Sequence, residues 1–201
     1  MDGKHKGFTL IEILVVVTII GVLAGLVVVL IPKGQFEAQK TECINNVRQL
    51  AGLLVPGDKY PEASGPNFLL YFVMKQEIAR DKDKLKILFC PGDTAGWSQA
   101  GGPDAYKDLD LKKRDYDHLT SYAGRDQLNR TCTVRKGDTS TQVLLCDEDE
   151  AYHGKKGLVV GLNDGSAKWR DKVDYYSKSV ETAIAVGETS EIEELKCLRR
   201  E

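Results

Sequence analysis

One acidic residue lies within a long apolar run near the start of the sequence. Residues 8–31 carry a single charge, that of Glu12. About 20 apolar residues in a helix cross a bilayer, so this run is long enough to span one. A carboxylate inside such a span costs several kcal/mol unless a partner neutralises it, and the run contains no basic residue. Glu12 therefore either lies close enough to the interface to reach water or has a functional partner.

A cut after Gly7 would create such a partner. It would leave a positive α-amino group on Phe8, and the amine of one subunit could neutralise Glu12 of its neighbour. A secretory signal has an apolar stretch of only about 7–15 residues and a small-residue cleavage site, and a buried core helix would need apolar cover on every side. We therefore expect a membrane span, with a simple N-terminal anchor as the alternative. Within it, Gly21 and Gly25 form a G-x-x-x-G pair that favours close helix packing, unless the two glycines are incidental.

The second group of candidate residues surrounds His153. Asp147 and Asp149 precede it and Asp164 follows it, so a histidine–carboxylate pair for proton transfer is conceivable. The chain has no Gly-x-Ser-x-Gly elbow, P-loop, His-Glu-x-x-His helix or Cys-x-x-Cys pair, so we do not expect an enzyme. Asp147, Asp149 and Asp164 would supply oxygen ligands for calcium if the Asp164 hairpin folded back on the acidic loop; a solvated loop is the alternative.

Five cysteines leave at least one unpaired if the head lies in an oxidising compartment. Cys132 and Cys146 flank a turn, and a hairpin would bring them together. Cys43 and Cys90 would pin the head to the preceding helix. With these pairings, Cys197 would be the unpaired cysteine.

The elements that position these residues are a long helix and a small sheet. After Pro32 the apolar residues recur at spacings of three, four and seven as far as Leu54, which predicts an amphipathic helix that ends before Pro56. In the head we expect a short helix at 68–79 and strands at 86–90, 121–123, 131–135, 142–146, 157–162 and 166–169, with helices at 175–186 and from 190. Asn163-Asp164-Gly165 predicts a tight hairpin turn. The fold class is therefore α+β, with residues 32–55 as the second half of one helix and 56–201 as an antiparallel head.

Gly7-Phe8-Thr9-Leu10-Ile11-Glu12, followed by the unbroken apolar run, resembles the class III signal of type IV pilins and type II secretion pseudopilins. The resemblance implies a leader of residues 1–7, a span at 8–31, and a prepilin peptidase that cleaves after Gly7 and methylates Phe8. It implies that Glu12 recruits each subunit into a filament of like or related subunits. Inner-membrane assembly machinery and membrane lipid are then the other partners, with the N-terminus cytoplasmic and the head periplasmic or otherwise extracytoplasmic.

Four head segments resemble the pseudopilin G-like branch, which has a C-terminal His…Asp-Gly element. In order, they are Cys43-x-Asn-Asn-x-x-Gln-Leu50, Phe89-Cys-Pro-Gly-Asp93, Thr120-Ser-Tyr-Ala-Gly124, and His153-Gly with Asn163-Asp-Gly-Ser-Ala-Lys-Trp169. The resemblance to this branch indicates the architecture of the head more than its activity.

The charge balance excludes one class of partner. With 28 Lys and Arg against 30 Asp and Glu, the net charge is −2, which does not favour nucleic-acid binding. We therefore expect a structural subunit of a pilus or a type II secretion pseudopilus. The alternative is a membrane-anchored extracytoplasmic binding module that does not polymerise.

Overall fold

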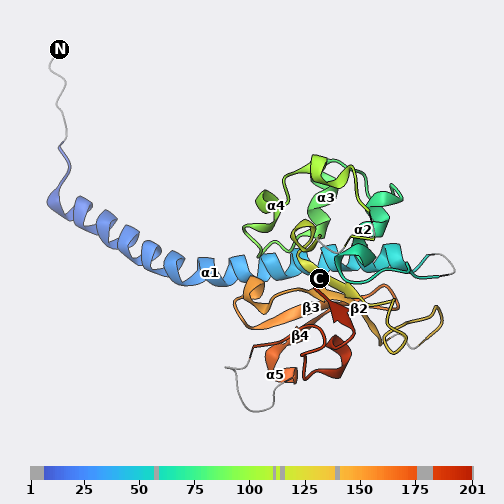
Figure 1. The fold of residues 1–201 in the computed structure, drawn as a ribbon. Helices are drawn as coiled ribbons and strands as arrows, with labels where there is room; N and C mark the ends of the chain where they lie inside the picture. The colour runs from blue at the N-terminus through green and yellow to red at the C-terminus, as the bar shows by residue number, and fades with distance from the viewer. Residues whose placement is uncertain are drawn as a thin grey trace. The chain divides into compact units, whose positions relative to one another are not determined.

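The computed structural model describes residues 7–56, 59–110, 112–113, 116–138, 141–175 and 183–200. The chain divides into two units, Met1–Ala38 and Gln39–Glu201. Helix α1 (Leu10–Leu54) begins in the first unit and ends in the second (Figure 1).

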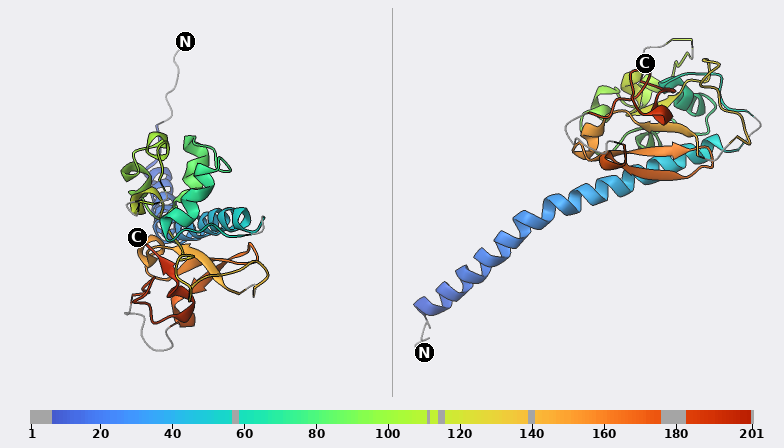
Figure 2. Two further views of the ribbon diagram at one scale, coloured as in Figure 1. Left: turned by 45° about the vertical axis from the view of Figure 1, so that its right-hand side comes forward. Right: turned by 90° about the horizontal axis from the view of Figure 1, so that it is seen from below.

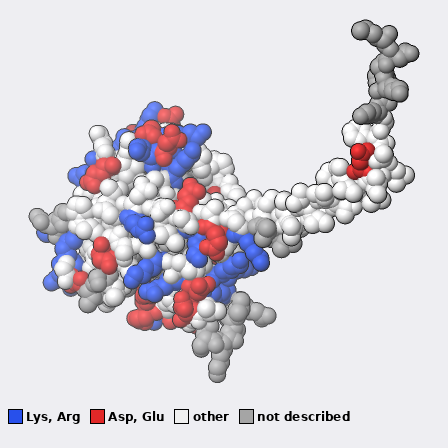
Figure 3. Space-filling view, turned by 180° about the vertical axis from the view of Figure 1, so that it is seen from behind, with Lys and Arg blue, Asp and Glu red and all other residues white. Residues whose placement is uncertain are grey.

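The first unit consists of the apolar part of α1. Its large apolar side chains from Phe8 to Val28, and that of Ile31, are between 49% and 84% exposed. The helix is long and apolar enough to cross a membrane. Figure 3 shows that this surface is almost free of charge, whereas both signs of charge are mixed over the head. Pro32 lies inside the helix and has no N–H to donate to the carbonyl four residues earlier.

The second unit is layered around the remainder of α1. This part of α1 lies between the sheet on one side and small helices on the other, and the views agree on this arrangement (Figures 1 and 2). The small helices are α2 (Pro66–Met74), α3 (Lys82–Leu85) and α4 (Gly96–Gln99). The amphipathic stripe of the helix is confirmed, because its apolar positions are buried: Cys43, Val47, Leu50, Ala51 and Leu54.

The sheet is antiparallel and has the strand order β4-β3-β2-β1-β5. Its strands are β1 (Tyr122–Arg125), β2 (Val143–Asp147), β3 (Gly157–Leu162), β4 (Ala167–Asp171) and β5 (Leu198–Arg199). Every residue of β2 and β3 is buried, since one face packs against α1 and α2 and the other against the C-terminal segment. The α+β fold class is thus confirmed, and the predicted hairpin turn is present, with Gly165 at φ 80°.

One glycine allows the helix to approach the sheet closely. A Cβ atom on Gly161 would lie 2.7 Å from Leu145 Cδ2 and 3.0 Å from Val47 Cγ1. Both distances are shorter than ordinary contacts, so a side chain at this position would push β3 away from α1. The absence of a side chain on Gly161 therefore helps to set the spacing of the two layers.

Two of the predicted strands, at 86–90 and 131–135, are not strands in the structure. Residues 86–88 form a 3₁₀ turn that continues α3, because Asp81 caps that helix by accepting from the backbone N–H groups of Asp83 and Lys84. The segment 131–135 is irregular, and the outer edge of β1 pairs with β5. The helix predicted from residue 190 is only a 3₁₀ turn, Glu193–Leu195, that leads into β5. Of the helix predicted at 175–186, residues 176–182 lie outside the described residues; α5 (Lys172–Tyr175) ends where it was expected to begin.

Candidate functional site

Thr9 and Glu12 cap the start of α1 through reciprocal hydrogen bonds. The Glu12 carboxylate accepts from the Thr9 backbone N–H at 2.7 Å and from its hydroxyl at 2.8 Å. The Glu12 N–H donates to Thr9 Oγ1 at 3.3 Å. This is a capping box, a pattern of Thr and Glu three residues apart that satisfies orphan donors at a helix start. We did not predict it, although the Thr-x-x-Glu spacing is its sequence signal.

The other residues predicted to act at the N-terminus lie on this same segment. Gly7 and Phe8 directly precede the capping box, and residues 1–6 of the predicted leader lie outside the described residues. A Cβ atom added to Gly21 or Gly25 would meet nothing within 4 Å, so both positions present bare backbone. Their part in helix packing stays a prediction.

In the head, four side chains with metal-ligand chemistry meet in the core. They are Cys43 from α1, Cys90 from the loop after residues 86–88, Asp147 at the end of β2, and His153 at the end of a 3₁₀ helix. Each is at most 1% exposed. One ligand atom from each lies within 4.8 Å of the others. We call this group the buried cluster.

The contacts inside the buried cluster link its members into a chain. Cys43 Sγ donates to Asp147 Oδ1 at 3.0 Å, and His153 Nε2 lies 3.2 Å from Asp147 Oδ2. Cys90 Sγ lies 3.4 Å from the same imidazole nitrogen. Two outer contacts support the set: the Val159 N–H donates to Asp147 Oδ2 at 2.7 Å, and the Tyr122 hydroxyl lies 3.6 Å from Cys43 Sγ.

Local backbone features bring Cys90 and His153 together. The loop of Cys90 turns at Pro91-Gly92, and a Cβ atom on Gly92 would lie 1.9 Å from the Tyr152 carbonyl oxygen. Only glycine permits this approach to the 3₁₀ helix Glu150–His153. Asp149 caps the start of that helix by accepting from the Ala151 N–H. The backbone then leaves His153 through Gly154, at φ 62°.

Burial and neighbouring groups set the protonation of the buried cluster. Burial disfavours the imidazolium, but hydrogen bonds to Asp147 and Cys90 outweigh it and raise the pKa of His153 to about 10. Burial raises the pKa of Cys43, whereas the hydrogen bond from Cys43 lowers the pKa of Cys90. The hydrogen bonds to Asp147 and Cys90 thus favour the charged form of His153 despite its burial.

The four head segments singled out in the sequence meet around this cluster. Each of the first, second and fourth contributes a member, and the third contributes Tyr122. Asn46 of the first segment donates to the Phe89 carbonyl of the second at 3.2 Å. Ser121 of the third donates to Asp93 of the second at 2.6 Å. In the fourth, the ring of Trp169 packs edge to face with His153 at a centroid distance of 5.3 Å.

The predicted calcium ligands do not come together. Asp147 lies opposite Val159 on the β2–β3 ladder, whereas Asp164 lies five residues further on, in the turn, about 16 Å away at about 3.3 Å per residue. Asp164 is exposed and accepts from the Ser166 N–H, while Asp149 caps the 3₁₀ helix. Among the described residues, the buried cluster is the one group of metal-ligand side chains, and it contains only Asp147 of the predicted three.

The predicted cysteine pairing is also wrong. Cys132 forms a disulfide with Cys197, the residue that we expected to be left over, and Cys146 is free. Cys146 cannot reach Cys132, because it lies within β2, where its thiol donates to the Asp147 carbonyl. Cys43 and Cys90 are neighbours as predicted, but both are free thiols.

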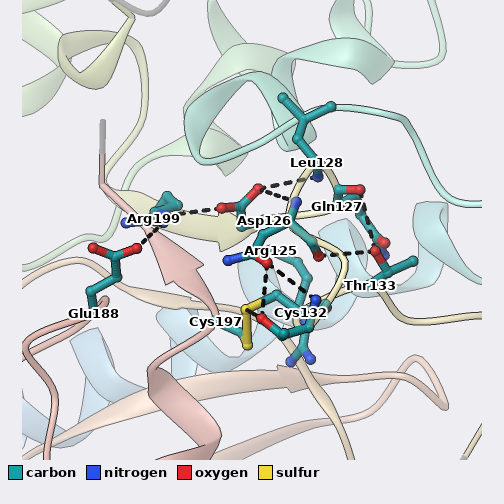
Figure 4. A network of polar contacts seen from close by, with 11 residues as sticks. Arg125, Asp126, Gln127, Leu128, Cys132, Thr133, Glu188, Cys197 and Arg199 are labelled. Atoms are coloured by element: carbon teal, nitrogen blue, oxygen red, sulfur yellow. Dashed lines mark hydrogen bonds and ion pairs between the residues drawn. A yellow bond between two sulfur atoms is a disulfide. The ribbon is translucent and has the colours of Figure 1, made fainter.

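A polar network holds the two halves of this disulfide in place (Figure 4). Arg125 Nε donates to the Cys132 carbonyl at 2.7 Å, and the Asp126 N–H donates to the Cys197 carbonyl at 2.9 Å. Asp126 also pairs with Arg199 at 3.0 Å.

Comparison with known proteins decides the class of the N-terminus. Residues 2–28 match the family model described as the prokaryotic N-terminal methylation motif. The N-terminal segment is type IV pilin-like. The matched segment contains Gly7, Phe8, Thr9 and Glu12, and the match supports processing by a prepilin peptidase. No curated protein and no solved structure matches the chain.

Proposed function

We propose that this pilin-like chain is a structural subunit of a pilus or a type II secretion-type pseudopilus. The observation that carries the proposal is the position of Glu12, which follows the processing point by a few residues at the start of the otherwise uncharged, exposed part of α1. A helix with this surface requires apolar cover, which lipid provides before assembly and neighbouring helices provide afterwards. The N-terminus is then cytoplasmic and the head extracytoplasmic.

Processing and assembly are coupled through charge in this proposal. Cleavage after Gly7 and methylation of Phe8 leave a positive amine near the Glu12 carboxylate of an adjacent subunit. Within its own chain, Glu12 contacts the uncharged Thr9. The amine of a neighbour supplies the opposite charge that a carboxylate in a membrane requires. Gly21 and Gly25 then allow close approach of the helices.

The test compares two substitutions of Glu12. Glu12→Leu removes both the charge and the capping box, whereas Glu12→Gln removes the charge but keeps a side chain that serves in a capping box. We expect both variants to enter the membrane and lose their leader, yet to be absent from sheared filaments and from crosslinked ladders of subunits. Wild-type incorporation of both variants would contradict the proposal and support a non-polymerising anchored module.

Processing has a separate readout. The N-terminal mass of protein taken from its native cell is expected to correspond to a chain that begins at Phe8 and carries one methyl group. A chain that retains Met1 would contradict the processing step.

A further inference from the structure

We propose that the buried cluster of Cys43, Cys90, Asp147 and His153 is a structural zinc site. Two thiols, one imidazole and one carboxylate are a donor set that suits Zn²⁺, a borderline-soft ion that binds sulfur, nitrogen and oxygen in tetrahedral geometry. Calcium and magnesium require oxygen ligands in larger numbers than this cluster offers.

The separations of the ligand atoms fit one small ion. Bond lengths of about 2.3 Å to sulfur and about 2.0 Å to nitrogen or oxygen place tetrahedral ligands roughly 3.3–3.8 Å apart. Cys90 Sγ and His153 Nε2 are 3.4 Å apart, and His153 Nε2 and Asp147 Oδ2 are 3.2 Å apart. Cys43 Sγ lies 3.0 Å from the second carboxylate oxygen, Asp147 Oδ1. One ligand atom from each of the four residues lies within 4.8 Å of the others, so small side-chain movements would bring all four to one ion.

Burial indicates a structural site and not a catalytic one. All four residues are at most 1% exposed, which leaves no coordination position open to water or substrate. Zinc binding would release to solvent one proton from each thiol and the Nε2 proton of the His153 imidazolium, so that the imidazole binds in its neutral form. The contact of Asp147 with the Val159 N–H then serves as the outer hydrogen bond that orients a ligand.

The positions of Cys43 and Cys90 favour a metal site over a disulfide. The head already holds one disulfide, Cys132–Cys197, so its cysteines are compatible with an oxidising compartment. Cys43 and Cys90 nevertheless converge as free thiols on an imidazole and a carboxylate. A metal ion uses all four groups, whereas a Cys43–Cys90 disulfide would use two and leave the Asp147–His153 pair buried beside it.

The first experiment measures metal in the full-length chain. The protein is purified in detergent micelles through an affinity tag without histidine and without chelator, and its metals are quantified by plasma mass spectrometry. We expect about one zinc ion per chain. A chain that lacks zinc after purification and after incubation with zinc chloride would overturn the proposal, as would another first-row metal at that stoichiometry.

The second experiment uses a matched pair of cysteine variants. The double variant Cys43→Ser/Cys90→Ser is expected to lose at least about tenfold in bound zinc, because even outer-shell changes cost 10–100-fold in affinity. Cys146→Ser changes a buried free cysteine outside the cluster and is expected to retain its zinc. Zinc content that is the same in the double variant as in the wild type would place the metal elsewhere and overturn the assignment.

Two readouts on the wild-type chain do not depend on a variant that folds. Replacement of zinc by Co²⁺ is expected to give the thiolate-to-cobalt absorption of sulfur ligation and the visible bands of tetrahedral cobalt. Intact-mass measurement after alkylation under denaturing conditions is expected to show Cys43 and Cys90 as free thiols. Absence of the thiolate–cobalt absorption, or a Cys43–Cys90 disulfide in the native protein, would overturn the proposal.

Discussion

Removal of the Cys132–Cys197 disulfide is expected to destabilise the head by about 3 kcal/mol. The two cysteines are 65 residues apart in sequence, and the loop-closure relation gives about 4 kcal/mol for a loop of that length. Measured values fall below this relation when the reduced chain keeps structure, so we expect the lower figure. For a unit of this size, it corresponds to a fall of about 10 °C in Tm.

The structure indicates that this loss of stability comes from the missing crosslink and not from a rearrangement of the backbone around it. The network of Figure 4 holds the backbone on each side through the Cys132 and Cys197 carbonyls, and neither contact involves sulfur. Cys197 is only half-buried, so a serine there keeps access to solvent. The double variant Cys132→Ser/Cys197→Ser is therefore expected to fold and to unfold at a lower temperature.

The assay is thermal unfolding of the full-length chain in detergent, followed by tryptophan fluorescence. The two tryptophans, Trp97 and Trp169, both lie in the head, so the signal reports on that unit. A phosphine reductant is expected to lower the Tm of the wild type to that of the double variant and to leave the double variant unchanged. Equal melting of the variant and the oxidised wild type would refute the reasoning, because the loop would then not be crosslinked.

Two further glycine substitutions have matched controls on α1. Gly161→Ala is expected to destabilise the head by about 1–3 kcal/mol, because the added methyl group is overpacked between β3, β2 and α1. The control is Gly52→Ala, whose methyl group meets nothing within 4 Å. In the same unfolding assay it is expected to stabilise the head by about 0.5–1 kcal/mol. A lower Tm for Gly52→Ala than for Gly161→Ala would contradict the packing argument. Gly21→Leu is expected to reduce filament incorporation, as scored in sheared filaments, without loss of membrane insertion, whereas Gly34→Leu, outside the G-x-x-x-G pair, is expected to assemble as the wild type does. Equal assembly of both leucine variants would show that the pair is incidental.

Residues whose partners are close in sequence could be predicted well. The apolar span, the stripe of α1 and the Asn163–Gly165 turn depend on local spacing, and each appears where it was expected. The strand predicted at 86–90 failed because a side-chain cap at Asp81 starts a helical turn, which an apolar run does not indicate. Calcium ligands chosen by proximity in sequence failed because the ladder separates Asp147 from Asp164.

The cysteines show why long-range pairing is not accessible from spacing. Cys132 and Cys146 are near in sequence, yet β1 pairs with β5 at its edge and brings Cys197 to Cys132 instead. The buried cluster likewise depends on four segments whose approach is decided by the packing of α1 on the sheet and by the absence of a side chain on Gly92. Neither feature has a local signal beyond the residue types themselves.

The proposed zinc site and the proposed filament role both depend on α1. A subunit retained through the N-terminal part of α1 needs its head fixed to the same helix. Within the second unit that attachment includes the buried stripe, the hydrogen bond from Asn46 to the Phe89 carbonyl and the contacts of Cys43. Apolar packing alone is non-directional, so it resists sliding along the helix axis less than a coordinate bond does. A metal ligand from α1, joined to ligands from β2 and from two loops, would fix the helix register against the head. The zinc measurements therefore test whether this register is held by coordination or by packing alone, and either result leaves the Glu12 assembly test independent.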